Sequence, residues 1–347
     1  MTKGADVASI DEAALETYLA SHMPGFKGPL VAKKYNTGQS NPTYSITSPS
    51  GHYVLRRKPP GLLLKSAHAV DREYRVMKAL ASQGVPVPQM RVLCEDDSVL
   101  GTSFFVMDHV DGNIYWDPAL PEQTQAARVK IYDEMNRVLV ALHSVDPNAC
   151  GLGDYGKPGS YFQRQLTRWS QQYRASETGT IEAMDQLILW LEKNLPADDG
   201  RVSVVHGDYR IDNMIFDRSS HEVLAVLDWE LSTLGHPFAD LAYQCMQWRL
   251  PNAGTFRGLE GIDRKAMGIP TEADYVALYC QRMGFSAISN WAFYLAFSFF
   301  RLAAILQGVK KRALDGNASN PERARVMGEN VSALAAMALT TIEKEGA

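Results

Sequence analysis

The stretch that decides the fold is Val204-Val-His-Gly-Asp-Tyr-Arg-Ile-Asp-Asn-Met-Ile-Phe216, which is followed by a second strand-like run that ends at Asp228. Asp208 comes directly after β-forming residues, so we expect it on an irregular loop at the end of a strand. Asn213 lies five residues later. One carboxylate can accept a hydroxyl proton, while a second carboxylate and an amide oxygen can hold a hard cation such as Mg²⁺. This set of groups suits phosphoryl transfer, in which positioning and charge neutralisation do most of the catalysis.

Each of these three residues is an ordinary turn former, so any one of them alone is equally typical of a cap between strands. Their order and spacing carry more information. The catalytic loop of protein kinases reads H-R-D-x-x-x-x-N. Here His206-Gly-Asp208 is followed, after four residues, by Asn213, and Asp228 stands at the place of the metal-binding aspartate of D-F-G. We expect His206 to orient the loop by bonding backbone groups and to take no part in acid–base chemistry.

Outward from this loop, the chain resembles the aminoglycoside phosphotransferase family of kinase-like enzymes. Within that family it is most similar to the kinase-like domain fused to some long acyl-CoA dehydrogenases and to its free-standing bacterial relatives. The matches follow kinase order and run from about residue 35 to residue 245. Besides the loop they comprise residues 38–44, 53–61, 67–73, 85–88, 105–108 and 228–241.

The resemblance implies an α+β, bilobal, protein-kinase-like fold with a small β-rich N-terminal lobe and a large helical C-terminal lobe. The residues agree with it, because strand-like patterns dominate up to about Gly112 and amphipathic helical patterns dominate from Pro121 onward. We place the N-terminal lobe at residues 1–110 and the C-terminal lobe, with the catalytic loop and the acceptor site, at residues 111–347.

The family implies a role for each residue of the loop region. Asp208 would be the catalytic base, or the group that orients the acceptor hydroxyl. Asn213 and Asp228 would hold Mg²⁺ and so belong to the catalytic set as well. Asp240 resembles a position that braces the loop, which is a structural role.

The family also implies an ATP site between the lobes. Glu73 would pair with the basic residue of the third strand, and backbone groups around Met107 to His109 would receive the adenine. Backbone N–H groups of residues 38–44 would cover the phosphates. Together these features give the nucleotide-binding candidates, which are Gly38, Gln39, Ser40, Asn41, Arg56, Glu73, Met107 and His109.

The sequence departs from the kinase pattern at three places. The strand position that carries lysine in kinases is Arg56, with Arg57 or Lys58 as the alternatives if the register differs. Arginine is a planar fork, so it would neutralise phosphates with a different geometry. The phosphate loop contains only Gly38 within its turn, and Asp228-Trp-Glu230 replaces D-F-G, which leaves the role of Glu230 open.

Composition excludes several classes of function. The 347 residues carry 35 Lys and Arg against 39 Asp and Glu, a net charge of -4, which lacks the basic footprint of a nucleic-acid-binding protein. The four cysteines form no C-x-x-C pair, which favours a reducing cytoplasm. The apolar run from Ala292 to Phe300 is shorter than the roughly 20 residues of a membrane span, so we expect a buried core helix and no membrane partner.

The charge of the C-terminal region bears on the phosphate acceptor. Residues 231–347 contain 12 Lys and Arg against 10 Asp and Glu, so no acidic trough for a polycationic aminoglycoside is evident. With the resemblance, this balance makes a hydroxyacyl-CoA or a related hydroxy acid the leading acceptor. The basic residues that would suit such an anion are Arg249, Arg257, Arg264 and Lys265.

Three alternatives remain open at this point. The first is that the chain is an aminoglycoside or other small-alcohol kinase. The second is that it is a nucleotide-binding pseudokinase, which Arg56 and the glycine-poor loop would favour. The third is acyl-CoA dehydrogenase activity, for which the region after the kinase-like matches is too short to supply a separate flavin domain. The nucleotide preference and the oligomeric state are not predicted.

Overall fold

Five antiparallel strands form the N-terminal sheet of the computed structural model, which describes residues 10–35, 41–59, 69–157, 159–254, 256–316 and 320–345. The strands β1 (Val31–Lys34), β2 (Thr43–Ser48), β3 (Gly51–Arg57), β4 (Met90–Cys94) and β5 (Phe104–Asp108) lie in the order β1-β2-β3-β5-β4. β1 and β2 form an antiparallel hairpin in which Lys34 pairs with Tyr44. Part of the predicted phosphate loop, Gly38, Gln39 and Ser40, lies outside the described residues.

Alternation along β5 gives the sheet two buried faces, because successive side chains of a strand point to opposite sides. Phe104 and Val106 pack with Leu19 of the first helix, whereas Phe105 joins the large core together with Met77 of the second. The helices of this part are α1 (Glu12–His22), α2 (Val70–Leu80) and the short α3 (Asp97–Leu100).

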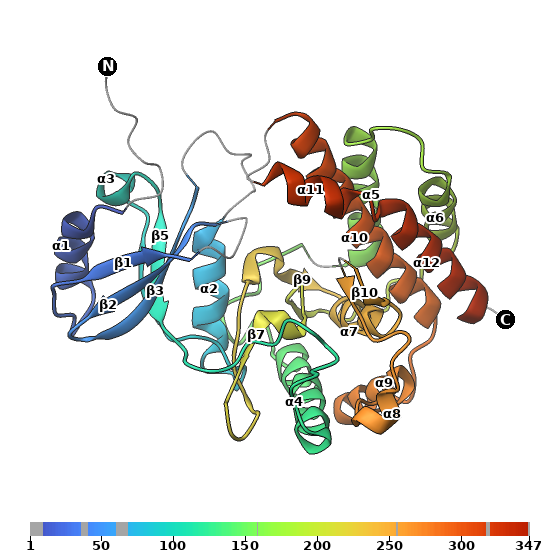
Figure 1. Cartoon of the computed structure of the whole chain (residues 1–347), viewed down its shortest axis with the longest axis horizontal. Coiled ribbons are helices and arrows are strands. Elements are labelled where there is room, and N and C mark those ends of the chain that lie inside the picture. Colours follow the sequence, from blue (N-terminus) through green and yellow to red (C-terminus); the bar gives the residue numbers. More distant parts are fainter. Residues whose placement is uncertain are drawn as a thin grey trace.

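The chain beyond β5 is mainly helical, as the sequence indicates. The amphipathic stretch from Tyr161 to Leu195, for which the sequence predicts an interruption near Gly179, is two helices, α5 and α6, separated by residues 176–181. The helices are α4 (Gln125–His143), α5 (Tyr161–Ala175), α6 (Glu182–Lys193), α7 (Phe238–Cys245), α8 (Arg264–Met267), α9 (Glu272–Met283), α10 (Trp291–Leu314), α11 (Pro321–Gly328) and α12 (Val331–Glu345). Figure 1 shows the sheet and α1 at one end of the molecule and α6 and α12 at the other.

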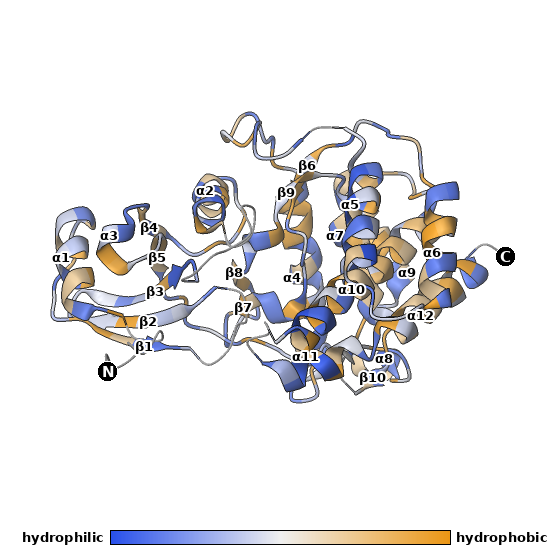
Figure 2. Cartoon of the chain, turned by 90° about the horizontal axis from the view of Figure 1, so that it is seen from above, coloured by the Kyte–Doolittle hydropathy of each residue, from blue (hydrophilic) through white to orange (hydrophobic). Residues whose placement is uncertain are grey.

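α10 is the central helix of the C-terminal part and packs against α5, α6, α7, α11 and α12. It is the one helix among the described residues that is long and apolar enough to cross a membrane, and 78% of its apolar window is buried. Phe293, Phe297 and Phe300 are all within the core. The interpretation of this run as a core helix is therefore confirmed. Seen from above, the helices carry both hydrophilic and hydrophobic residues, as helices with one buried face do (Figure 2).

Short strands between the sheet and the helices carry the motif loops. β6 (Ser203–Val205) pairs with β9 (Thr233–Gly235), and β7 (Met214–Phe216) pairs with β8 (Val223–Val226). The loop with Asp208 therefore connects two separate ribbons and is not a hairpin turn. Two turns of 3₁₀-helix, η1 (Ile211–Asn213) and η2 (Trp229–Leu231), follow Asp208 and Asp228 respectively. The remaining elements are η3 (Met246–Trp248), β10 (Asn252–Ala253) and β11 (Phe256–Arg257).

Candidate functional site

The loop that carries Asp208 is held in shape by its own histidine. His206 is fully buried, and its Nδ1 accepts a hydrogen bond from the backbone N–H of Asp208 at 3.1 Å. Its Nε2 lies 2.9 Å from the backbone oxygen of Leu227, to which it donates. Both ring nitrogens are thus bonded to backbone groups, one at Asp208 and one at Leu227, the residue before Asp228. The expectation that His206 orients the loop is confirmed.

Asp240, in the first turn of α7, anchors the start of the same loop. Its carboxylate is fully buried and accepts from the backbone N–H of His206 at 2.6 Å and of Gly207 at 2.8 Å. His143 of α4 places its Nε2 at 3.4 Å from the same carboxylate. Burial raises the pKa of Asp240, but His143 and the N–H donors outweigh it and the pKa is lowered. Asp240 therefore stays ionised and braces the loop, as its family position implies.

Gly207 allows the loop to turn between these two anchors. Its φ is +85°, a region that side chains disfavour, and a Cβ built there would lie 2.6 Å from the backbone oxygen of Leu231. We expect Gly207→Ala to lower the free energy of unfolding by about 1–3 kcal/mol from backbone strain, and by more from the clash. Urea unfolding measures the loss.

Gly200→Ala is the matched control, because Gly200 has a φ of +77° with nothing within 4 Å of its Cβ position. Equal losses in the two variants would show that the approach to Leu231 is unimportant.

Asp208 itself is surrounded by groups that stabilise its charged form. Asn213 donates from Nδ2 to the Asp208 carboxylate at 3.0 Å and to its backbone oxygen at 2.9 Å. Arg210 forms an ion pair with the other carboxylate oxygen, with Nε at 3.1 Å. Burial raises the pKa of Asp208, but Arg210 and His206 lower it by more than burial raises it, so the pKa is below its ordinary value and the carboxylate is ionised. The side chain is 19% exposed, so the carboxylate is also accessible.

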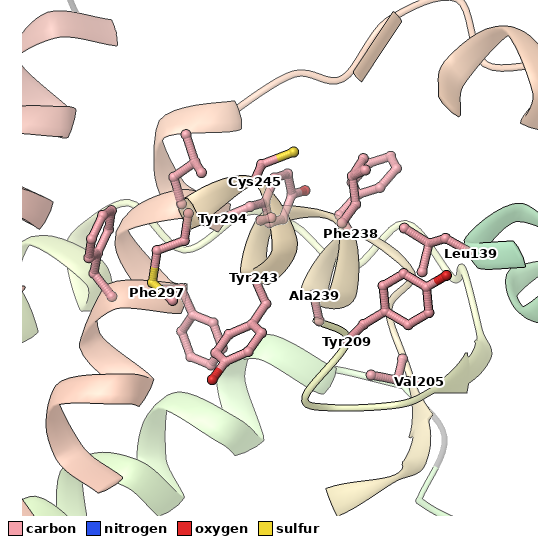
Figure 3. Close-up of a cluster of buried hydrophobic side chains, with 14 of the residues drawn as sticks. Leu139, Val205, Tyr209, Phe238, Ala239, Tyr243, Cys245, Tyr294 and Phe297 are labelled. Atoms are coloured by element: carbon pink, nitrogen blue, oxygen red, sulfur yellow. The ribbon is translucent and has the colours of Figure 1, made fainter. Parts of the chain in front are cut away.

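Tyr209 anchors the loop in the core next to Asp208. Its ring is buried, and Figure 3 shows it between Leu139 and Val205. Its hydroxyl donates to the backbone oxygen of Met135 at 2.7 Å. This bond ties the loop to α4 at the residue next to Asp208.

Arg56 is the basic residue of β3 that reaches the motif loops. Its Nη2 lies 2.7 Å from Asp228 and 3.4 Å from Glu230, and its Nε lies 3.3 Å from Glu73 of α2. Arg57, the next residue, is on the opposite face of the strand and packs over Tyr44. Strand alternation therefore selects Arg56, and the predicted register is the one that the structure has.

Glu73 is buried at the centre of this ionic cluster. Its carboxylate also accepts from Nδ2 of Asn41 at 2.9 Å, so Asn41 holds Glu73 in place. Burial raises the pKa of Glu73 to about 8, against the opposing attraction of Arg56. The Glu73–Arg56 pair implied by the family is present, and it ties α2 to the strand and to Asp228.

Asp228 follows β8 and has an unusual backbone conformation. Its φ is +65°, the left-handed region that a non-glycine residue adopts at a cost. The side chain is 37% exposed and lines a cavity together with Arg56, Glu73 and Asn213. Such strain is maintained by surrounding contacts, here the ion pair with Arg56. In this conformation the Asp228 carboxylate lines the part of the cavity that the C-terminal lobe forms.

The cavity has a volume of about 370 Å³, within the range of small-molecule sites. One part is apolar and the other carries the charged residues just described. Asp208 is not part of its lining and is connected to it through Asn213. The apolar side chains that line it include Val54, Met77, Phe105, Met107, Ile114, Ile215 and Leu227.

The predicted adenine segment lines the apolar part of this cavity. Met107 and His109 both border it. However, the N–H of Asp108 donates to Gln89 and the N–H of His109 donates to His52 within the sheet, so these two donors are already engaged. An adenine ring at this edge would have to use other backbone groups of the segment.

Two site residues were missed by the sequence analysis. Arg210 pairs with Asp208, and its Nη2 lies 3.2 Å from Asp212. Asp212 lines the cavity beside Asn213, and burial raises its pKa. Both lie inside the quoted loop, where charged residues between the two motif positions were the available signal.

Known proteins with similar sequences show the family to which this chain belongs. The model of the phosphotransferase enzyme family matches residues 31–268. Mouse acyl-CoA dehydrogenase family member 10 is 49% identical over 340 residues, which are 97% of this chain and 32% of the relative. The probable acyl-CoA dehydrogenase IBR3 of Arabidopsis thaliana is 42% identical over 357 residues, which are 96% of this chain and 43% of the relative. The chain thus spans less than half the length of these relatives, and the resemblance extends past residue 245, where the motif matches thin out.

Solved structures give the same result. A Ralstonia eutropha JMP134 protein assigned to the aminoglycoside phosphotransferases is 50% identical, with a TM-score of 0.88 and coverage of 97% of this chain and 99% of that one. Aminoglycoside phosphotransferase APH(4)-Ia, in a ternary complex with AMP-PNP and hygromycin B, is 16% identical with a TM-score of 0.59, and the match covers 93% of this chain and 98% of that one. The latter likeness concerns the kinase-like fold alone. Because the family match covers most of its residues and the Ralstonia protein is similar from end to end, the chain belongs to the aminoglycoside-type phosphotransferase enzyme family.

Proposed function

We propose that this chain transfers the γ-phosphate of ATP to a hydroxyl group of a small molecule, in a reaction that needs Mg²⁺. The observation that carries the proposal is the convergence of five side chains from distant segments. Asn213 and Asp228 line the same cavity as Arg56 and Glu73 of the N-terminal part, and Asp208 lies next to it, bonded to Asn213.

In the proposed reaction the acceptor hydroxyl oxygen forms a bond to the γ-phosphorus, and the bond from that phosphorus to the β–γ bridging oxygen breaks. The electron pair of the broken bond leaves with ADP. The hydroxyl proton passes to the Asp208 carboxylate, whose lowered pKa makes it a weak base. A weak base suits a loose transition state, in which the hydroxyl oxygen needs orientation more than early deprotonation.

The residues present fit a magnesium ion that is completed by phosphate oxygens. Asn213 uses Nδ2 for Asp208, which leaves its Oδ1 for a cation, and Asp228 exposes a carboxylate to the cavity. In the described ranges no group of three or more His, Cys, Asp or Glu forms a complete cation site. Mg²⁺ commonly uses one or two carboxylates plus substrate phosphates, so this donor set is sufficient. When bound, the ion would neutralise charge on the phosphates.

Asp228 must exchange its partner when nucleotide and metal bind. In this structure its carboxylate is occupied by Arg56 at 2.7 Å. Release of that contact would leave Arg56 paired with Glu73 and directed toward the phosphates, as the lysine of kinases is. Arg56 then offsets phosphate charge, although with a fork in place of a point charge.

For the acceptor we propose a hydroxyacyl-CoA or a related hydroxy acid. Two observations support it: the C-terminal region has no excess of acidic residues, and the curated relatives are named acyl-CoA dehydrogenase family members. The alternative is an aminoglycoside or another small alcohol, which the hygromycin B in the APH(4)-Ia complex favours.

The experiment that tests the proposal is ADP release from Mg-ATP with a panel of acceptors. The panel comprises hydroxyacyl-CoAs, free hydroxy acids, aminoglycosides, choline and homoserine. Turnover on the acyl acceptors alone supports the full proposal, and robust turnover on aminoglycosides overturns its acceptor half. ATP binding without turnover on any acceptor would instead favour a nucleotide-binding pseudokinase.

We expect Asp228→Ala to abolish the Mg²⁺ dependence of ATP binding, because it removes the only carboxylate of the proposed metal pair. Calorimetric titration of ATP with and without Mg²⁺ measures this, and we expect the roughly tenfold or greater gain in affinity from the metal to disappear. Glu192→Ala, an exposed carboxylate on α6, is the control and keeps the metal effect. An unchanged metal effect in Asp228→Ala would contradict the assignment.

A further inference from the structure

Arg301, near the middle of α10, is a buried arginine without a charged partner. The residue is 6% exposed, and among the described residues it makes no hydrogen bond or ion pair. Its guanidinium carbon lies 5.3 Å from the ring centre of Tyr243 and 5.7 Å from that of Trp169. Burying a charge in this way is costly unless a partner compensates it, and stacking on two rings compensates it only in part.

The guanidinium group borders accessible space. None of its nitrogens is among the fully buried polar atoms that lack a partner, so they are not sealed in the core. The hydroxyl of Tyr161, at the start of α5, is in the same situation: it has no hydrogen-bond partner among the described residues and is also absent from the sealed atoms. Two polar groups from different helices thus have no hydrogen-bond partner among the described residues, and Arg301 acts electrostatically on Tyr161.

This position is adjacent to the catalytic candidate and distinct from the nucleotide cavity. Tyr243 connects them, because its ring stacks with Arg301 and its hydroxyl lies beside Asp208. Arg301 also acts electrostatically on both Asp208 and Tyr161. It does not line the cavity that contains Arg56 and Asp228. A molecule that contacts Arg301 would thus approach Asp208 from the acceptor side.

The nearby acids are already engaged. Asp208 pairs with Arg210, and Asp240 accepts from the loop N–H groups. Two of the basic residues that the sequence indicates for binding an anionic acceptor also have acidic partners. Arg249 pairs with Glu272, and Arg257 lies 3.6 Å from Asp117. Arg301 therefore leaves an unbalanced positive charge next to the acceptor hydroxyl.

We propose that Arg301, together with the hydroxyl of Tyr161, binds the acyl oxygen of the phosphate acceptor. This oxygen belongs either to the carboxylate of a hydroxy acid or to the thioester carbonyl of a hydroxyacyl-CoA. The contact holds one end of the acceptor while Asp208 orients its hydroxyl. Arg301 is a specificity-determining residue, and this inference rests on the proposed acyl acceptor.

The kinetic test uses Arg301→Met, which keeps the apolar stem, with Arg301→Lys and Tyr161→Phe as milder variants. Loss of a charge-assisted hydrogen bond should raise the KM for an acyl acceptor about 10- to 100-fold in Arg301→Met. Tyr161→Phe should raise it about 3- to 10-fold. The KM for ATP and the turnover of a neutral diol should stay within about twofold. Arg174→Met, at an exposed and paired arginine of α5, is the control.

A binding measurement separates this inference from the proposed function. Butyrate and butyryl-CoA carry the acyl oxygen but no hydroxyl to phosphorylate, and calorimetry measures their affinity for each variant. Arg301-dependent binding of either ligand supports the inference even if no acceptor is phosphorylated, a result that would overturn only the proposed function. The ligand that shows the dependence identifies carboxylate or thioester as the source.

Three results would overturn the inference. The first is equal affinity of wild type and Arg301→Met for both acyl ligands, and the second is no binding of either to the wild type. The third is a parallel loss of turnover on the neutral diol, which would indicate a structural role. If Arg301→Met fails to fold, Arg301→Lys and Tyr161→Phe decide the question by the same measurements.

Discussion

Asp208→Asn is expected to remove nearly all phosphate transfer while leaving the fold intact. The substitution keeps the shape of the side chain and takes away the group that receives the hydroxyl proton. A positioned acid–base group contributes about 10²- to 10⁴-fold to rate, so we expect a fall in kcat of that size. Asn213 donates to the carboxylate, and Arg210 faces it across the loop. The variant amide cannot satisfy both as the carboxylate does, which adds misalignment to the lost proton acceptor.

The measurement is ADP release with the best acceptor, together with ATP binding and urea unfolding of the same variant. ATP affinity should be unchanged within about threefold, because Asp208 does not line the nucleotide cavity. Asp217→Asn is the control: Asp217 follows β7, accepts hydrogen bonds from the backbone N–H groups of Ser219 and Ser220, and has no part in the site. Turnover that survives in Asp208→Asn would refute the assignment of Asp208.

The lowered pKa of Asp208 also predicts how the stability difference between wild type and Asp208→Asn changes with pH. Its folded pKa lies below the unfolded value, so its charge stabilises the native state above the unfolded pKa, near 3.9. That contribution is lost as the pH falls through the lower, folded pKa. The stability difference between wild type and Asp208→Asn should therefore be largest near neutral pH and should shrink below about pH 4.

The catalytic loop could be predicted from sequence because its chemistry is local. His206, Asp208 and Asn213 lie within eight residues, and their spacing alone indicates the kinase-like loop. Arg56 could be predicted because β-strand alternation leaves only one of two adjacent arginines facing Glu73.

Features that depend on distant contacts were not predictable. Nothing near Val204 indicates that its strand pairs with Leu234 and not with the strand ten residues later. Arg301 follows a strongly apolar run, so the local sequence predicts only that a hydrophobic segment ends there. Only the packing of α10 against α5 and α7 places it on Trp169 and Tyr243. The proposed acceptor side of the site is built from such contacts, which explains why the local sequence pattern does not single out Arg301.

Asp240→Asn is expected to have the largest effect on stability. The fully buried carboxylate accepts from two backbone N–H groups and contacts His143. An amide can accept only with its one oxygen, so a donor would face the NH₂ group of the variant. Removing one partner of a buried charged network costs about 3–5 kcal/mol. We therefore expect a loss of this size in urea unfolding at neutral pH, and a loss of turnover because His206 and Gly207 are released.

The pH dependence distinguishes this mechanism from a general packing defect. Burial raises the pKa of Asp240, yet His143 and the N–H donors bring the folded pKa below the ordinary value. The unfolded chain then binds more protons in acid, so the stabilisation by Asp240 is present at neutral pH and is lost as the pH falls through the folded pKa. The gap between wild type and Asp240→Asn should consequently be widest near neutral pH and should narrow as the pH falls below about 4. A gap that stays constant as the pH falls below about 4 would mean that shape, and not the charge of Asp240, holds the catalytic loop.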